Sequence, residues 1–255
     1  MSEIRQALDE AGFEVRSLAT NYRGGTRLEP HFHDWPQLVY AARGAMSVDV
    51  GHATWVVPPH RAVWVPEHTP HTIEMIGAVA MRTLYLAPHL ASHLADECQT
   101  IDVSPLLREL VLETIRLGML HRDVPTQQRL IGVLIDQLSR IESTPLRLPM
   151  PRHVRLRPIA EHLRAHPLDA DKLEAIAAQA GMSTRTLELL FMQETQLTFV
   201  QWRQRMRMLH ALRLLASDEP VTAVALSVGY QSPSAFIAAF KRELGVTPGD
   251  YFEGA

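Results

Sequence analysis

The stretch of sequence that decides the fold occurs twice near the end of the chain. It runs LEAIAAQAGMSTRTLELLF over Leu173–Phe191 and VTAVALSVGYQSPSAFIAAF over Val221–Phe240. Each copy has a short run with helical apolar spacing, then a glycine, then a serine, then a second amphipathic run that ends on phenylalanine. Glycine can take the positive φ of a tight turn, and serine can cap the helix that follows. Each copy therefore predicts a helix-turn-helix unit.

A long amphipathic segment, residues 199–217, joins the two copies and predicts one continuous helix. Such a helix would hold the two units apart, so that their second helices could reach successive major grooves, which are about 34 Å apart. Net charge indicates little DNA affinity, because residues 151–255 carry twelve Lys and Arg against eleven Asp and Glu. The positive charge is instead concentrated in the joining helix, at Arg203, Arg205, Arg207 and Arg213.

The chain has 255 residues, of which 46% are hydrophobic and 21% charged, and a net charge of −3, as is typical of a globular protein of two domains. Cys98 is the only cysteine, so the chain cannot form an internal disulfide, and a reducing compartment is expected. Residues 1–12 lack the basic stretch and apolar core of a signal peptide. No apolar run approaches the roughly 18 residues of a membrane span. We therefore expect a cytoplasmic protein with no membrane partner.

Residues 13–87 predict β structure, because short apolar runs alternate there with Gly and Pro. The expected strands are Leu38–Ala42, Met46–Val50, Thr54–Val57, Ala62–Val65 and Val79–Leu86. Strands at this spacing are typical of a sandwich or a small barrel. The chain as a whole predicts an α+β protein, with a β domain over residues 1–87 and an all-α domain over residues 154–255 that contains both helix-turn-helix units.

Residues 88–142 have the apolar spacing of helices. Two apolar faces are expected, one formed by Leu106, Leu107, Leu110, Val111, Thr114 and Ile115, and the other by Leu130, Val133, Leu134, Gln137, Leu138 and Ile141. These faces could pack on the β domain or form the interface of a homodimer, and periodicity does not separate the two. Residues 143–153 contain three prolines and no periodicity, which predicts a linker between the domains.

Further residues make the C-terminal region resemble a known family. Over residues 212–248 the chain reads LRLLA, VTAVA, GYQSPSAF, FKR and GVTP at the intervals typical of the AraC/XylS family of bacterial transcription regulators. The resemblance covers about residues 155–252. It implies a ligand-responsive transcriptional regulator, an activator in preference to a repressor, that binds double-stranded DNA and acts with RNA polymerase.

The resemblance also implies DNA contacts at individual positions. Bases would be read by Arg185, Glu188 and Leu189 in the first unit and by Ser234, Ala235 and Ala238 in the second. Phosphates would be bound by Thr184, Arg203, Lys241 and the helix N-terminus at Ser232. Glu188 could accept a hydrogen bond from a cytosine amino group, and Ala235 could contact a thymine methyl group. Arg185 is the only basic residue over positions 183–194, which indicates weak phosphate anchoring and favours binding as a dimer.

Histidines in the β domain follow another pattern. Gly25, His31, His33, Gln37 and Gly44 have the spacing of the first cupin motif, with Gln where Glu is usual. Pro66, His68 and His71 match the second motif, with His68 where Gly is usual. The β domain therefore resembles a cupin, which is also the usual sensor fold of this regulator family.

Alternate residues of a strand face the same side, so His31 and His33 would point together into the barrel, where Gln37 and His71 could join them. These three imidazoles and one amide oxygen are a candidate site for a divalent transition metal, and the lack of a carboxylate favours Zn or Ni over Fe or Mn. The same four residues, with Trp35 between them, could instead bind a small-molecule effector directly. Aromatic side chains that could line this pocket or fill the core are Trp35, Tyr40, Trp55, Trp64 and Tyr85.

Two functions from different classes therefore compete. The first is a regulator whose effector enters the cupin domain and changes DNA binding, which requires that the effector bind two conformations differently. The second is a cupin metalloenzyme, a dioxygenase or isomerase, fused to a DNA-binding module. The absence of Glu at position 37 and the presence of the DNA module both favour the regulator, and we expect no enzyme activity.

Overall fold

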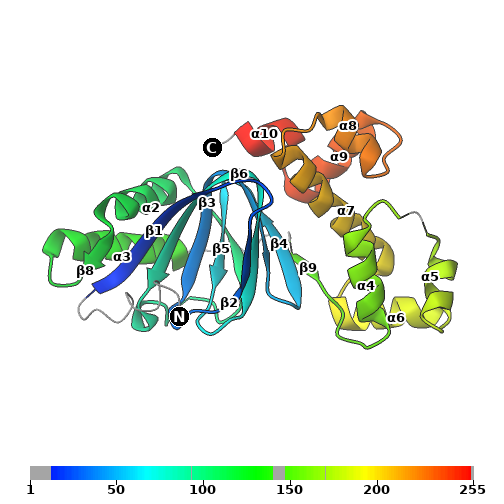
Figure 1. Ribbon diagram of the computed structural model, residues 1–255, viewed down its shortest axis with the longest axis horizontal. Coiled ribbons are helices and arrows are strands. Elements are labelled where there is room, and N and C mark those ends of the chain that lie inside the picture. The colour runs from blue at the N-terminus through cyan, green and yellow to red at the C-terminus, as the bar shows by residue number, and fades with distance from the viewer. Residues whose placement is uncertain (1–12, 93, 140–146, 170, 254–255) are drawn as a thin grey trace. The chain divides into compact units, whose positions relative to one another are not determined.

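The computed structural model describes residues 13–92, 94–139, 147–169 and 171–253. Contacts divide them into two compact units, shown together in Figure 1. The β unit contains residues 13–48 and 57–139, and the helical unit contains residues 49–56 and 147–253. The expectations for residues 1–12, for Ile141 and for positions 143–146 lie outside the described residues. No helix in the described part of the chain is long and apolar enough to cross a membrane.

The β unit is an antiparallel sheet. Its strands are β1 (Phe13–Tyr22), β2 (Arg27–His31), β3 (Gln37–Asp49), β5 (Arg61–Val65), β6 (His71–Leu86), β7 (Gln99–Asp102) and β8 (Met119–His121). The order across the sheet is β7-β5-β3-β6-β1-β8, and β2 also pairs with β6. Strand β6 neighbours β3 on one side, and on the other it is long enough to pair with two strands, its first residues with β2 and Val79–Leu86 with β1. This double pairing brings the end of β2 to the start of β6.

Two helices pack beside this sheet, α2 (Pro105–Leu117) and α3 (Pro125–Ser139), and they lie next to β1 and β8 in Figure 1. A short 3-10 helix, η1 (Pro88–Leu90), follows β6. The buried side chains of α2 and α3 join strand residues in one core: Leu107, Leu110, Val111, Ile131, Leu134 and Leu138 with Val15, Leu38, Tyr40 and Trp64. The alternative in which these helices pack on the β structure is therefore confirmed for these residues.

Two details of the helical expectation are wrong. Leu106 and Val133 were placed on the apolar faces, but their side chains are 52% and 41% exposed. Leu106 is the second residue of α2, directly after Pro105 and two positions after the capping Ser104, so it lies in the first turn of the helix. The segment also contains the strands β7 and β8, which pair with β5 and β1, so residues 88–139 are not wholly helical.

The helical unit contains seven helices among its described residues. They are α4 (Leu156–Ala165), α5 (Leu173–Gln179), α6 (Thr184–Thr195), α7 (Phe199–Ala216), α8 (Val221–Ser227), α9 (Pro233–Leu244) and α10 (Pro248–Glu253). Strand β9 (Arg147–Pro149) pairs with β4 (Ala53–Val57), so part of the expected linker is a strand. The buried indole of Trp202 donates a 2.7 Å hydrogen bond to the carbonyl oxygen of Pro149, which ties β9 to α7.

The repeat in the sequence is a repeat in the structure. The turns contain Gly181 and Gly229, both with positive φ (63° and 87°). The serines Ser183 and Ser232 cap α6 and α9, and each side chain accepts a hydrogen bond from a backbone amide three residues later. The phenylalanines that end the two copies, Phe191 and Phe240, are fully buried. Both helix-turn-helix units thus have the expected elements in the expected order.

Candidate functional site

Three histidines meet in the β unit. His31 is the last residue of β2, His71 is the first of β6, and the antiparallel register places them opposite each other. His33 follows two residues after β2 has ended, so the three are not held by strand alternation alone. Their ligand nitrogens lie within 4.8 Å of one another, and the ring centroids of His31 and His71 are 4.4 Å apart. The structure therefore brings together the three histidines that the motif singles out.

Backbone carbonyls fix the protons on two of these rings. Nδ1 of His31 lies 2.6 Å from the carbonyl oxygen of Glu29, and Nδ1 of His71 lies 2.9 Å from that of Thr69. A carbonyl oxygen can only accept a hydrogen bond, so both Nδ1 atoms must carry a proton. In a neutral ring the lone pair then belongs to Nε2, and Nε2 of His71 is buried without a hydrogen-bond partner. Nε2 of His33 is also buried and unpartnered.

The cluster favours uncharged imidazole. Burial, and then repulsion from His31, lowers the pKa of His33 to about 4. Burial also lowers the pKa of His71 to about 4, although the hydrogen bond to Thr69 opposes the shift. Both rings are therefore neutral at pH 7. A neutral imidazole with a free lone pair is the form that coordinates a transition metal or accepts a hydrogen bond from a polar ligand.

Gln37, the first residue of β3, is connected to this cluster through Tyr85. Its amide nitrogen donates to the hydroxyl oxygens of Thr83, at 3.2 Å, and Tyr85, at 3.1 Å. The Tyr85 ring in turn contacts His33 edge-on, with ring centroids 4.9 Å apart. Because both amide hydrogens point to these hydroxyls, the amide oxygen is the free end of the side chain, and it is buried without a partner. The role of Thr83 was missed, although it shares one face of β6 with Tyr85 two residues later.

The other candidate pocket residue, Trp35, has a different neighbourhood. Its ring packs on Phe13, with ring centroids 5.2 Å apart, in a cluster that also contains Tyr85. The described ring contacts place Trp35 against Phe13 and not against a cluster histidine. Tyr40 and Trp64 are fully buried in the main core. Of the aromatic residues proposed as pocket walls, Tyr85 is the one that the described ring contacts place against a cluster histidine.

The proposed base-reading side chains lie on the exposed faces of α6 and α9. Arg185, Glu188, Leu189, Ser234, Ala235 and Ala238 are all exposed. Leu189 is 57% exposed, while Leu187, two residues earlier, is fully buried, so the helix places position 189 outward at a cost in apolar hydration. Of the proposed phosphate contacts, Lys241 is exposed, and Thr184 and Ser232 are half-buried at helix N-termini.

Arg203 differs from the other proposed phosphate contacts. Its guanidinium donates to the carbonyl oxygens of Asp169 and of Asp171, the latter at 2.6 Å. Burial, and then repulsion from Arg207, lowers the pKa of this guanidinium below its usual range. Arg203 thus braces the loop before α5, in addition to any contact that it makes with DNA.

Comparisons with known proteins agree with this architecture. Residues 17–147 match the family described as an AraC-like ligand binding domain, and residues 176–254 match a helix-turn-helix domain. The chain is 36% identical over 221 residues to the HTH-type transcriptional regulator NimR of Escherichia coli K12, which covers 87% of this chain and 81% of NimR. The chain belongs to the AraC family.

Two further comparisons give lower sequence identity. The HTH-type transcriptional activator RhaS of Klebsiella pneumoniae is 24% identical over 249 residues, covering 88% of this chain and 87% of RhaS. Among solved structures, ToxT from Vibrio cholerae with a bound unsaturated fatty acid has a TM-score of 0.38 and 10% identity, over 94% of this chain and 95% of that one.

Membership in the AraC family decides between the two functions that the sequence left open. The chain has both a ligand-binding domain and a DNA-binding domain of the family, and its relatives are transcriptional regulators and activators. It is therefore a ligand-responsive, DNA-binding regulator of transcription. The hypothesis of a cupin metalloenzyme finds no support among these relatives.

Proposed function

We propose that this regulator receives its signal at the histidine cluster formed by His31, His33 and His71, and that the signal is a divalent transition metal of the Zn or Ni type. One observation carries the proposal: buried Nε2 atoms of His33 and His71, without hydrogen-bond partners, lie in a group of ligand nitrogens within 4.8 Å. A buried polar atom without a partner costs about 1–3 kcal/mol, which a ligand at this site would recover.

The donors around the cluster support this assignment. The carbonyl oxygens of Glu29 and Thr69 orient the rings of His31 and His71. Metal-binding histidines are commonly oriented in this way, by a hydrogen-bond partner outside the coordination shell. Imidazole nitrogen suits Zn and Ni, and Gln37 offers an amide oxygen in place of a carboxylate. A bound ion would cross-link the end of β2, the loop after it and the start of β6. An organic effector held directly by the same residues is the alternative.

Elemental analysis of the purified protein, together with thermal unfolding in added ZnCl2 or NiCl2, tests the proposal. We expect bound metal in the wild-type protein, and a rise in its unfolding midpoint that corresponds to about 2.7 kcal/mol when the metal is at 100 times its Kd. The double variant His31→Ala/His33→Ala should contain no metal and should show no rise. DNA binding without effector should remain near normal in this variant.

The matched control is His162→Ala/His166→Ala, which removes two exposed histidines, one in α4 and one at its C-cap, whose ring centroids are 4.6 Å apart. This control should keep the metal and its stabilisation. Metal that is lost from both double variants would mark adventitious binding and overturn the proposal. Stabilisation by organic compounds alone, dependent on His31 and His33, would replace the metal by a directly bound effector.

The remaining parts of the proposal concern the partners. We propose that the chain acts in the cytoplasm as a homodimer and activates transcription through RNA polymerase. One relative, RhaS, is named as a transcriptional activator, which supports activation. The single basic residue over positions 183–194 supports dimerisation, because a second subunit would supply the phosphate contacts that one reading helix lacks.

A further inference from the structure

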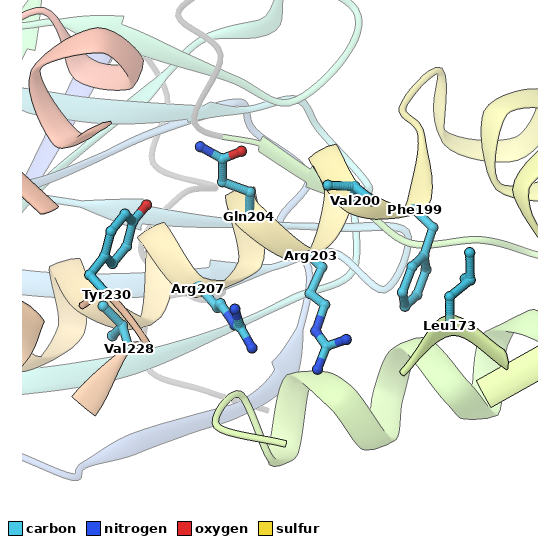
Figure 2. A pocket seen from close by; sticks show the side chains of 9 residues that line it. Leu173, Phe199, Val200, Arg203, Gln204, Arg207, Val228 and Tyr230 are labelled. Carbon is cyan, nitrogen blue, oxygen red and sulfur yellow. The ribbon is translucent and has the colours of Figure 1, made fainter. Parts of the chain in front are cut away.

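A groove of about 550 Å³ opens on one side of α7, within the helical unit (Figure 2). Leu173, at the start of α5, and Phe199 lie at one end of it. Val228 and Tyr230, in the turn between α8 and α9, lie at the other end. The groove therefore extends from the first helix-turn-helix unit to the turn of the second, along the helix that joins them.

Two guanidinium groups line the middle of the groove. Arg203 and Arg207 are one helical turn apart on α7, and Figure 2 shows them extending from the same side of that helix. Among the described residues, no carboxylate forms an ion pair with either group within 4.0 Å. Asp169 and Asp171 lie near enough to raise the pKa of Arg203, but burial and repulsion from Arg207 outweigh them. The groove thus holds two positive charges that repel each other.

The protein holds these charges in place. The carbonyl oxygens of Asp169 and Asp171 accept hydrogen bonds from the Arg203 guanidinium. Arg207 lies against the second turn, because a Cβ added to Gly229 would be 3.5 Å from Nη1 of Arg207. The Nε atoms of both arginines are buried without hydrogen-bond partners. Two positioned cationic groups with unused donors are typical of an anion site, and arginine matches the oxygens of a phosphate.

The position of the groove indicates which anion it would meet. A protein whose two reading helices enter successive major grooves faces the stretch of duplex between them. That stretch presents the phosphate backbones that border the intervening minor groove. We propose that the groove binds a phosphodiester of the DNA backbone at this point, through Arg207 together with Arg203 and the hydroxyl of Tyr230. The proposal rests on DNA binding by the helical unit, and it adds a central contact to those at the reading helices.

This contact would change how the helical unit is anchored on DNA. The helical unit has a net charge close to zero, with twelve basic and eleven acidic residues over positions 151–255, so its non-specific attraction to DNA is weak. A phosphate held between the two units would fix the register of both reading helices at once, because phosphate contacts position a protein on the duplex without reading bases. The weakly basic α6 would then depend less on phosphate contacts of its own.

The salt dependence of DNA binding tests this proposal with the full-length protein and an operator selected from a random-sequence pool. Arg207→Ala should lower affinity about ten-fold for the operator and for unrelated duplex alike, and should reduce the slope of log K against log salt by about 0.9. Arg207→Lys should largely restore the slope, because it keeps the charge. The control Arg129→Ala removes one exposed charge from α3 in the β unit and should leave the slope unchanged.

Neutralising single DNA phosphates locates the contact. A methylphosphonate placed midway between the two contacted major grooves should weaken wild-type binding but should not weaken Arg207→Ala further, as expected for two changes that remove one interaction. Additive effects at every phosphate would overturn the proposal. The proposal would also be overturned if Arg207→Lys lowered DNA affinity and the unfolding midpoint as much as Arg207→Ala does. Arg207 would then only brace the turn at Gly229.

Two further outcomes separate this proposal from its premises. Inorganic phosphate alone could protect the protein from unfolding while the methylphosphonate effects are additive. This result would assign the groove to a free anion and overturn the DNA contact. Wild-type protein that selects an operator, while Arg207→Ala keeps the wild-type slope, would refute the groove contact and leave sequence-specific regulation intact. A wild-type protein that selects no operator would contradict the proposed regulatory function instead.

Discussion

The protons on Nδ1 of His31 and His71 decide what the histidine cluster can bind. Both protons are committed to backbone carbonyls, so each ring can only accept or coordinate through Nε2. With the pKa values of His33 and His71 held near 4, the neutral form persists well below pH 7. Protons therefore compete only weakly with a ligand for these imidazole nitrogens at physiological pH.

Departures from the expected motifs have local explanations in the backbone. His68 stands where a cupin motif usually has Gly, and its φ of 57° is the left-handed conformation that Gly adopts most easily. The amide of His68 donates a 2.8 Å hydrogen bond to the carbonyl oxygen of His33, so His68 supports the loop that carries His33. Gln196 likewise ends α6 with a φ of 60°, where the second unit uses Gly245.

Base reading by α6 can be tested at one side chain. Arg185→Ala should relax base preference at one operator position and cost about 1–3 kcal/mol there, because Arg185 is exposed on the reading helix. Lys241→Ala should weaken binding to all sequences alike, because it removes only a phosphate contact. Lys241 is a better comparison than Arg203, whose loss would also release the loop at Asp169 and Asp171. Selection of preferred sites by each variant measures the difference, and identical preferences for Arg185→Ala and wild type would contradict the assignment.

Gly44 shows why two expected strands form one. The sequence suggested strands on either side of this glycine, but β3 is continuous from Gln37 to Asp49. Gly44 has a φ of 76°, and a Cβ there would lie 2.3 Å from the carbonyl oxygen of Ala78 in β6. A residue that looks like a strand end is instead a point of close approach between two backbones.

Gly44→Ala should therefore destabilise the β unit by more than the roughly 1–2 kcal/mol expected for a left-handed alanine. Gly25→Ala is the matched control, because Gly25 has a φ of 77° but no atom within 4 Å of the added Cβ. Urea denaturation of both variants separates backbone conformation from the clash with Ala78. Equal losses of unfolding free energy would show that β3 and β6 relax around the added methyl group.

The outward sides of α2 and α3 are the surfaces through which we expect the homodimer to form. Leu106 and Val133 are exposed there, while their neighbours Leu107 and Leu134 fill the core. Leu106→Asp/Val133→Asp should shift the protein towards monomer in sedimentation velocity, with its unfolding midpoint little changed. Val154→Asp, at an 80% exposed valine of the helical unit, should leave the association unchanged. A wild-type protein that is monomeric at all accessible concentrations would refute the dimer.

How much of the fold the sequence predicts depends on whether a signal is local. The caps at Ser183 and Ser232 and the turns at Gly181 and Gly229 act within a few residues, so both helix-turn-helix units could be predicted. Strands β8 and β9 have three residues each and exist through pairing with β1 and β4. No pattern within three residues can indicate such a partner.

The same distinction applies to the candidate site. The motif spacing singled out all three histidines of the cluster, but it could not show that a backbone carbonyl fixes each Nδ1 proton of His31 and His71. The motif spacing also could not show that Gln37 donates its amide hydrogens to Thr83 and Tyr85. The arrangement around Arg207 depends on the turn at Gly229, 22 positions later, and no sequence spacing indicates that contact.

Regulation requires that ligand binding and DNA binding change each other. If metal bound at the histidine cluster changes operator affinity by a given factor, operator DNA must change metal affinity by the same factor. We expect this factor to lie in the usual range of about 5–150-fold. Titrating metal into the protein with and without operator, and operator with and without metal, measures the factor twice. Factors that differ beyond error would show that a second binding site or a change of oligomeric state contributes.

The replacement of a carboxylate by Gln37 has an electrostatic consequence for the whole sensor. If the proposed dication binds there, imidazole and amide donors leave its double charge uncompensated, which is costly in a partly buried site. An anionic co-ligand from solution would neutralise it, and the carboxylate of a small metabolite is one such group. The metal would then be one half of a composite signal, and the regulator would report the coincidence of an ion with an acid.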